Sequence, residues 1–306
     1  MGKANLKFKT LAQYKAPFNY ELSGRHFHIF LDNGSEYSLI FLDGENLQYA
    51  KKGESYIWDY YECMKGDDTT YFVHVRPLEF NGKVSYNWII DTAQNLVTLV
   101  ITEEGVIPAA ERLIRVTPIF GAIKVPGRKL NEKRHFFTDR MVGKHICWQY
   151  NPDFSIQHIY HKPTLYRLPL YDVEGIKKKH EAETDPRERE RRAAMLDRFE
   201  RTKDTYPFCE EPCFHITINE SLNLFCFVEE NETLMDPLKA IGGGGLILLQ
   251  DIERLTDVGV GFSLGEYYML SAFGSENEDG DEVDNLIAPY DQTKLETIPC
   301  IYTIDL

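Results

Sequence analysis

Two segments of the chain repeat one pattern of residues. Residues 24–41 read GRHFHIFLDNGSEYSLIF, and residues 143–160 read GKHICWQYNPDFSIQHIY. Each segment opens with a glycine, a basic residue and a histidine, and turn-forming residues follow at the same distance. Alternation of apolar and polar residues with a period of two is typical of β-strands, and Asp-Asn-Gly between two such runs indicates a hairpin. The repeat therefore predicts that the chain contains two copies of one β unit.

Further strand patterns fill the first copy. Short runs rich in β-branched and aromatic residues predict strands at about 25–31, 36–42, 47–50, 56–63, 70–76, 84–91 and 95–102. Short strands at regular spacing favour a sandwich or an up-and-down barrel, and closure into a barrel would remove exposed strand edges. We therefore expect an N-terminal arm at 1–22, a first β lobe at 23–125 and a second lobe at 126–306.

One segment departs from the β pattern. From about Val173 to Lys203 the charged runs KKKH and RERERR are separated by few apolar residues, which predicts a helical insertion at about 171–208. A solvated, salt-bridged helix is the preferred interpretation, and a functional basic patch is the alternative. The acidic stretch 275–284 does not fit a calcium loop, because Leu286 stands where a glutamate ligand is required. We expect an acidic surface loop there.

Charge and cysteine content exclude several classes of partner. The chain has 34 Lys and Arg against 48 Asp and Glu, a net charge of -14, which repels phosphate backbones and anionic lipid. We expect neither nucleic acid nor a membrane as a partner. Six cysteines scattered through a chain without a secretory signal indicate reduced thiols and a cytoplasmic protein. Cys209, Cys213 and His215 match no common zinc module and lack a fourth ligand, so we expect no metal.

The two repeated segments carry a resemblance to a known family. With Gly24-Arg-His opening one half and Gly143-Lys-His followed by His158-Ile-Tyr160 opening the other, the chain resembles the MoaF family. This resemblance implies an all-β fold of two tandem lipocalin-like (calycin) antiparallel β-barrels, with the helical segment inserted in the second. Despite the family's name we expect no molybdenum role, because the chain has neither a pterin-phosphate loop nor a metal site.

Each lobe also resembles, more distantly, phenolic acid decarboxylase, a small β-barrel enzyme that needs no cofactor. Its functional residues are two tyrosines on the first strand, an arginine that follows a tyrosine, and a glutamate at the end of a strand. In the first lobe these positions fall on Ile29, Leu31, Ala50 and Arg76, so all four are lost. In the second lobe they fall on Trp148, Tyr150, Arg167 (after Tyr166) and Glu220, so three of the four are retained.

Alternation supports a polar interior in the second lobe independently of any resemblance. Alternate residues of a strand share a face, so Trp148 and Tyr150 project together, as do His158 and Tyr160 on the next strand. The matching face of the first lobe, with residues such as Phe27, is ordinary core. The same parity argument sets His215 on the opposite face from Glu220, and so outside the site.

These residue types suit acid–base chemistry. A carboxylate in an apolar barrel has a raised pKa, which is useful for proton transfer near neutral pH. Arg167 would hold a substrate carboxylate or enolate, Tyr150 would donate to developing negative charge on oxygen, and Trp148 with Tyr160 would enclose a planar ligand. The competing interpretation is an ion pair between Arg167 and Glu220 that closes the barrel, with the aromatic residues as core.

We therefore expect a cofactor-independent lyase or isomerase acting on a small conjugated acid or a phenolic or aromatic metabolite in the second barrel. The alternative is a lipocalin-like carrier that binds a small planar or hydrophobic metabolite without transforming it. A third option is an interaction protein that uses the acidic loop and the charged helix, and a homodimer stays open. The expected catalytic residues are Tyr150, Arg167 and Glu220, and the expected substrate contacts are Trp148, His158, Tyr160 and Tyr166.

Overall fold

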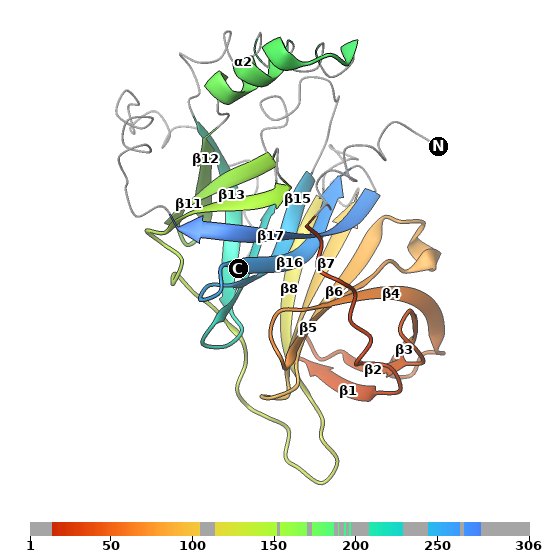
Figure 1. The fold of residues 1–306 in the computed structure, drawn as a ribbon. Coiled ribbons are helices and arrows are strands. Elements are labelled where there is room, and N and C mark those ends of the chain that lie inside the picture. Colours follow the sequence, from red (N-terminus) through yellow and green to blue (C-terminus); the bar gives the residue numbers. More distant parts are fainter. Residues whose placement is uncertain are drawn as a thin grey trace.

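The computed structural model describes residues 14–104, 114–151, 154–169, 173–186, 208–228, 244–263 and 266–276, and the single positions 189, 193 and 196. In these ranges the chain is nearly all β (Figure 1). None of the helices found there is both long and apolar enough to cross a lipid bilayer.

The first eight strands form a closed antiparallel barrel in which each strand pairs with its neighbour in sequence and β1 pairs with β8. A short 3-10 helix, η1 (Leu78–Phe80), lies between β5 and β6. The seven strands expected from the sequence are confirmed to within two residues at each end, because runs of β-branched and aromatic residues mark a strand whether one face is buried, as in β1, or both, as in β5. The strands are β1 (His26–Leu31), β2 (Glu36–Phe41), β3 (Asn46–Lys51), β4 (Ile57–Lys65), β5 (Thr70–Val75), β6 (Val84–Asp91), β7 (Leu96–Glu104) and β8 (Ile114–Ile123).

The second barrel is built in the same way. β10 pairs with β17, and the additional pairing of β12 with β13 closes a ring of eight antiparallel strands, β10 to β17. The short strand β9 pairs with the last residues of β13, outside this ring. The strands are β9 (Phe136–Phe137), β10 (His145–Asn151), β11 (Phe154–Lys162), β12 (Leu165–Pro169), β13 (Phe208–Thr217), β14 (Leu222–Val228), β15 (Gly244–Asp251), β16 (Thr256–Ser263) and β17 (Glu266–Glu276). Two tandem β-barrels, as expected from the sequence, are thus confirmed.

The inserted helix is also present. Helix α2 (Val173–Ala182) lies between β12 and β13 and begins where the charge pattern predicts it. The expected helical segment is interrupted at residues 183–185, which are not helical, and the described positions beyond them, 186, 189, 193 and 196, are helical again. Most of the remaining stretch to Lys203, and nearly all of the acidic stretch 275–284, lie outside the described residues.

The sequence repeat corresponds to a structural one. Gly24 and Gly143 each precede the first strand of a barrel, with φ of 76° and 90°. The Gly24 N–H donates to the Phe41 carbonyl oxygen at 2.7 Å, and the Gly143 N–H donates to the Tyr160 carbonyl oxygen at 2.8 Å. A positive φ favours glycine. The glycine that opens both copies therefore has the same conformational task in each barrel.

The two barrels pack against each other through a shared apolar core. Side chains on the outer faces of β4 to β8 meet side chains on the outer faces of β13 to β17. The first barrel contributes Met64, Phe72, Ile89, Val100, Ile114 and Val116. The second contributes Phe214, Ile216, Ile218, Leu222, Leu224, Cys226, Ile247, Leu249, Val258, Val260, Phe262 and Met269. Because each barrel covers an apolar outer face of the other, neither exposes it to water.

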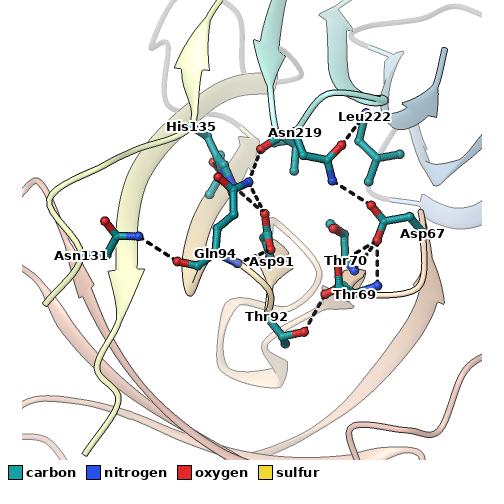
Figure 2. Close-up of polar contacts among 12 residues, drawn as sticks. Asp67, Thr69, Thr70, Asp91, Thr92, Gln94, Asn131, His135, Asn219 and Leu222 are labelled. Atoms are coloured by element: carbon teal, nitrogen blue, oxygen red, sulfur yellow. Dashed lines mark hydrogen bonds and ion pairs between the residues drawn. The ribbon is translucent and has the colours of Figure 1, made fainter. Parts of the chain in front are cut away.

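Polar contacts beside this core join equivalent turns of the two barrels (Figure 2). Oδ1 of Asp67 accepts from the Thr70 N–H in the β4–β5 turn, and Oδ1 of Asn219 accepts from the Leu222 N–H in the β13–β14 turn. The Asn219 side-chain amide also donates to Oδ2 of Asp67 at 2.7 Å. Gln94 donates to the Ile218 carbonyl oxygen at 3.0 Å nearby. The two equivalent turns are thus joined directly by the hydrogen bond between Asn219 and Asp67.

Part of the N-terminal arm also bridges the barrels. The Tyr14 N–H donates to the Tyr150 carbonyl oxygen and the Ala16 N–H donates to Ser271 Oγ, both in the second barrel. Asn19 then donates to the Cys63 carbonyl oxygen in the first barrel. The described part of the arm therefore runs from one barrel to the other.

Candidate functional site

The interior of the second barrel combines aromatic rings with polar atoms, as the alternation of residues predicts. Residues directly opposite each other in an antiparallel pair share a face, and Ile146 pairs with His158 while Tyr160 pairs with Tyr166. Trp148, Tyr160 and Tyr166 have no exposed surface. Together with the buried Tyr150, the structure brings five expected site residues into one interior. They are Trp148, Tyr150, His158, Tyr160 and Tyr166.

The other two expected catalytic residues do not join them. Arg167 pairs with Ile159 and Glu210, and it therefore lies on the opposite face of β12 from Tyr166. It is only 5% exposed, so it is buried outside the barrel interior. Glu220 is exposed in the turn after β13, and its carbonyl oxygen accepts from the Arg140 guanidinium. The expectation that Tyr150, Arg167 and Glu220 face a common cavity does not match this geometry.

Two local features of the chain explain why Arg167 and Glu220 lie outside the barrel interior. Tyr166 and Arg167 are adjacent in a strand and must point to opposite faces. β13 ends at Thr217, and the Asn219 side chain then accepts from two backbone N–H groups to form the turn that carries Glu220. Parity does not extend through a turn, so the prediction that His215 lies outside the site is wrong. His215 pairs with Phe225 and stacks on its ring inside the barrel at 4.9 Å.

An unexpected carboxyl group lies in this interior. Asp257, on β16, is 2% exposed; its Oδ1 accepts from the Ala272 N–H at 2.7 Å, and Tyr150 Oη donates to its Oδ2 at 3.5 Å. Burial raises the pKa of Asp257 to about 7. Burial together with the Asp257 charge also raises the pKa of Tyr150. In the sequence, Asp257 alternates with Gly259 and Gly261, but its position just after a turn resembles that of an ordinary turn residue.

Tyr160 is the centre of a hydrogen-bond network in the same interior. Its hydroxyl oxygen accepts from Trp148 Nε1 at 3.1 Å and from Gln250 Nε2 at 2.9 Å, and it lies 3.4 Å from His158 Nδ1. Asn223 continues the network, because its side-chain nitrogen lies 3.2 Å from both Gln250 Oε1 and His215 Nδ1. The sequence pattern did not single out Gln250 or Asn223.

The two interior histidines are uncharged at neutral pH. Burial lowers the pKa of His158 and that of His215 to about 3 each. Among the described residues that face this interior, none is a lysine or an arginine. The described ranges also hold no group of three side chains able to ligate a metal, and the side chain of Cys209 lies outside them. The described interior can therefore donate and accept hydrogen bonds and exchange a proton at Asp257, without a fixed positive charge.

Comparison with known proteins identifies the first part of the chain. Residues 9–105 match the sequence model of the MoaF N-terminal domain. The resemblance to the MoaF family is confirmed for this segment. The MoaF-like segment covers the end of the arm and most of the first barrel, whereas the candidate site lies in the second barrel. The resemblance to phenolic acid decarboxylase is not confirmed.

Comparisons with curated proteins and with solved structures give no further relative of informative similarity. No curated protein matches the chain significantly. A solved structure described as a "putative beta-lactamase" from Burkholderia vietnamiensis is 13% identical, over 34% of this chain and 94% of its own, with a TM-score of 0.28. A score of this size carries no argument about fold or activity.

Proposed function

We propose that the second barrel binds a small planar metabolite and transforms it by acid–base chemistry without a cofactor, as a lyase or an isomerase. The observation that carries this proposal is the buried carboxyl group of Asp257, whose pKa is near 7 and which lies beside the Tyr150 hydroxyl in an aromatic interior. A group with such a pKa is present in both protonation states at neutral pH, so it can remove a proton and return one.

An isomerisation illustrates the chemistry. Asp257, as a carboxylate, takes a proton from a carbon next to a carbonyl group, and the electron pair of that C–H bond moves toward the carbonyl oxygen. Tyr150 donates a hydrogen bond to the enolate oxygen. The protonated Asp257 then returns a proton to carbon, so the reaction consumes no other reagent. The buried rings of Trp148 and Tyr160 would hold a planar ligand and exclude water.

A carrier function is the second candidate, and one observation favours it. Arg167 and Glu220, which were expected to complete the catalytic set, lie outside the barrel interior. Eight-stranded barrels are either filled by their own side chains or hold one small ligand, and binding alone needs no proton transfer.

The exchange of hydrogen for deuterium distinguishes the two candidates. We would incubate the protein in D2O with 4-hydroxyacetophenone, a planar neutral ketone, and follow the methyl signal by NMR. We expect protein-dependent exchange that Asp257→Asn abolishes while leaving affinity within about threefold. The matched control is Asp59→Asn, which alters a buried aspartate bonded to Tyr49 in the first barrel. Binding without exchange would support the carrier, and equal exchange by wild type and Asp257→Asn would refute the proposed role.

A further inference from the structure

The hydrogen-bond network of the second barrel contains two unsatisfied atoms, one on His158 and one on Asn223. Nε2 of His158 and Oδ1 of Asn223 have no hydrogen-bond partner among the described residues, although both side chains are fully buried. Buried polar atoms in folded proteins are nearly always paired, and those that are not call for an explanation such as a bound molecule. These two atoms belong to one network, since Tyr160 and Gln250 connect His158 to Asn223.

The network can be protonated in two self-consistent ways. In the first, Tyr160 accepts from Trp148 and Gln250 and must donate its own proton to His158 Nδ1, so that Nε2 of His158 carries a hydrogen. Asn223 then presents a carbonyl oxygen without a donor. His158 is the unsatisfied donor and Asn223 the unsatisfied acceptor.

In the second arrangement both side-chain amides are flipped, since nitrogen and oxygen are assigned from the network itself. Gln250 then accepts from Tyr160, and His158 donates to Tyr160 through Nδ1. Nε2 of His158 becomes an acceptor, and Asn223 presents an unsatisfied N–H group. Both arrangements therefore leave one donor at one end of the network and one acceptor at the other.

The charge of the interior limits what can satisfy these atoms. His158 and His215 stay neutral at pH 7, and no lysine or arginine is found among the described interior residues. Among the interior side chains that the structure describes, the ionisable carboxyl group is that of Asp257, which disfavours a second negative charge nearby. A carboxylate ligand would lose its hydration there without gaining a counter-charge.

We propose that the second barrel selects a neutral planar molecule with one hydrogen-bond donor and one acceptor, which His158 and Asn223 recognise. This inference rests on the proposed binding function and specifies its ligand: a phenol with a carbonyl group fits, whereas a conjugated acid does not. Since a buried polar group left unpaired is costly, a ligand lacking the carbonyl should bind at least about tenfold more weakly.

Three probes that share one ring test this selection. 4-Hydroxyacetophenone carries the donor and the acceptor, 4-ethylphenol lacks the acceptor, and 4-hydroxybenzoate is anionic. Affinities measured by titration calorimetry at pH 7 should favour the ketone by at least about tenfold over each of the others. His158 and Asn223 contact opposite ends of the ligand, so the variant that removes the donor to the carbonyl group, either His158→Phe or Asn223→Leu, should reduce the preference for the ketone over 4-ethylphenol to within about threefold. The other variant removes the contact to the phenol hydroxyl and should weaken the binding of both probes by at least about tenfold. If only one variant folds, it should show one of these two effects, and a folded variant that shows neither would contradict the inference.

The outcomes separate this inference from the proposed chemistry. Equal binding of 4-hydroxybenzoate and the ketone would overturn the inference, as would a folded His158→Phe protein whose preference and whose affinity for both neutral probes are unchanged. Asp257→Asn serves as the control, because it should abolish exchange at the methyl group without altering the preference between the neutral probes. A preference for the ketone without hydrogen–deuterium exchange would support ligand selection by the barrel and reject the proposed acid–base chemistry. Exchange without a preference for the ketone would support the chemistry and reject the selection. Absence of binding by all three probes at millimolar concentration would reject both.

Discussion

The ionisation of Asp257 should make the stability of the protein depend on pH in an unusual direction. Its folded-state pKa is about 7 and the unperturbed value is 3.8. A group whose pKa is raised by folding stabilises the native state fully below the unfolded pKa, and this contribution is lost as pH rises through the folded pKa. The gap of about three pH units corresponds to roughly 4 kcal/mol in total, of which about 3 kcal/mol is lost between pH 5 and pH 8.

Asp257→Asn removes this loss, because a carboxamide is neutral at every pH. The substitution also lowers the free energy of unfolding by an amount that does not depend on pH, because the N–H groups of the asparagine would face the Tyr150 hydroxyl, which donates to Asp257 in the wild type. The free energy of unfolding of the variant minus that of the wild type should therefore rise by about 3 kcal/mol from pH 5 to pH 8. Other titrating groups cancel in this difference.

Urea unfolding followed by tryptophan fluorescence at pH 5, 6, 7 and 8 measures this difference. Asp59→Asn is the control, because Asp59 is also fully buried and accepts from the Tyr49 hydroxyl in the first barrel. A difference between Asp257→Asn and wild type that stays constant across the four pH values would refute the reasoning. It would mean that the carboxyl group is charged or solvated in the folded protein.

Three further predictions concern the fold. Gly24→Ala and Gly143→Ala should each lower the free energy of unfolding by about 1–2 kcal/mol, because both residues have positive φ. Urea titration measures this free energy, and an unchanged stability of either variant would contradict the equivalence of the two copies. Leu249→Ala, in the core between the barrels, should cost about 2–5 kcal/mol and leave a single transition in calorimetry, whereas separate transitions would show that the barrels unfold independently. Asp67→Asn should lower the free energy of unfolding by about 1 kcal/mol at pH 7, because it weakens the hydrogen bond from Asn219. The loss should be smaller at pH 3, because hydrogen bonds lower the pKa of Asp67 and the stability that its carboxylate contributes disappears as the pH falls through that pKa. An equal loss at both pH values would contradict this prediction.

The positions of the strands and the duplication of the β unit were predictable because both are local properties. A period of two in residues such as Phe27 and Ile29 sets which side of a strand is buried, whatever the strand packs against. The glycine before each first strand is equally local, since positive φ is a property of one residue. The aromatic side of the second barrel, with Trp148 and Tyr160, followed from the same alternation.

The composition of the candidate site was predictable only in part. Tyr166 and Arg167 were both assigned to the site, yet neighbours in a strand cannot share a face. Glu220 was placed on the strand, but the Asn219 side chain ends the strand by capping a turn, a competition between side-chain and backbone bonding that the strand pattern does not reveal.

Sequence alone determined that this chain forms two β units, each with an alternating apolar face. The contrast expected between an ordinary first interior and an aromatic second one is not found, since the first core also holds Tyr49, Tyr61 and Trp88. Tertiary structure decided which ionisable group enters the second interior and what that group does there. Asp257 has a pKa near 7 because strands far apart in the sequence bring Tyr150 and Ala272 around it and remove water. A pKa depends on the surroundings of a group more than on its neighbours in the chain, and those surroundings exist only after the barrel closes.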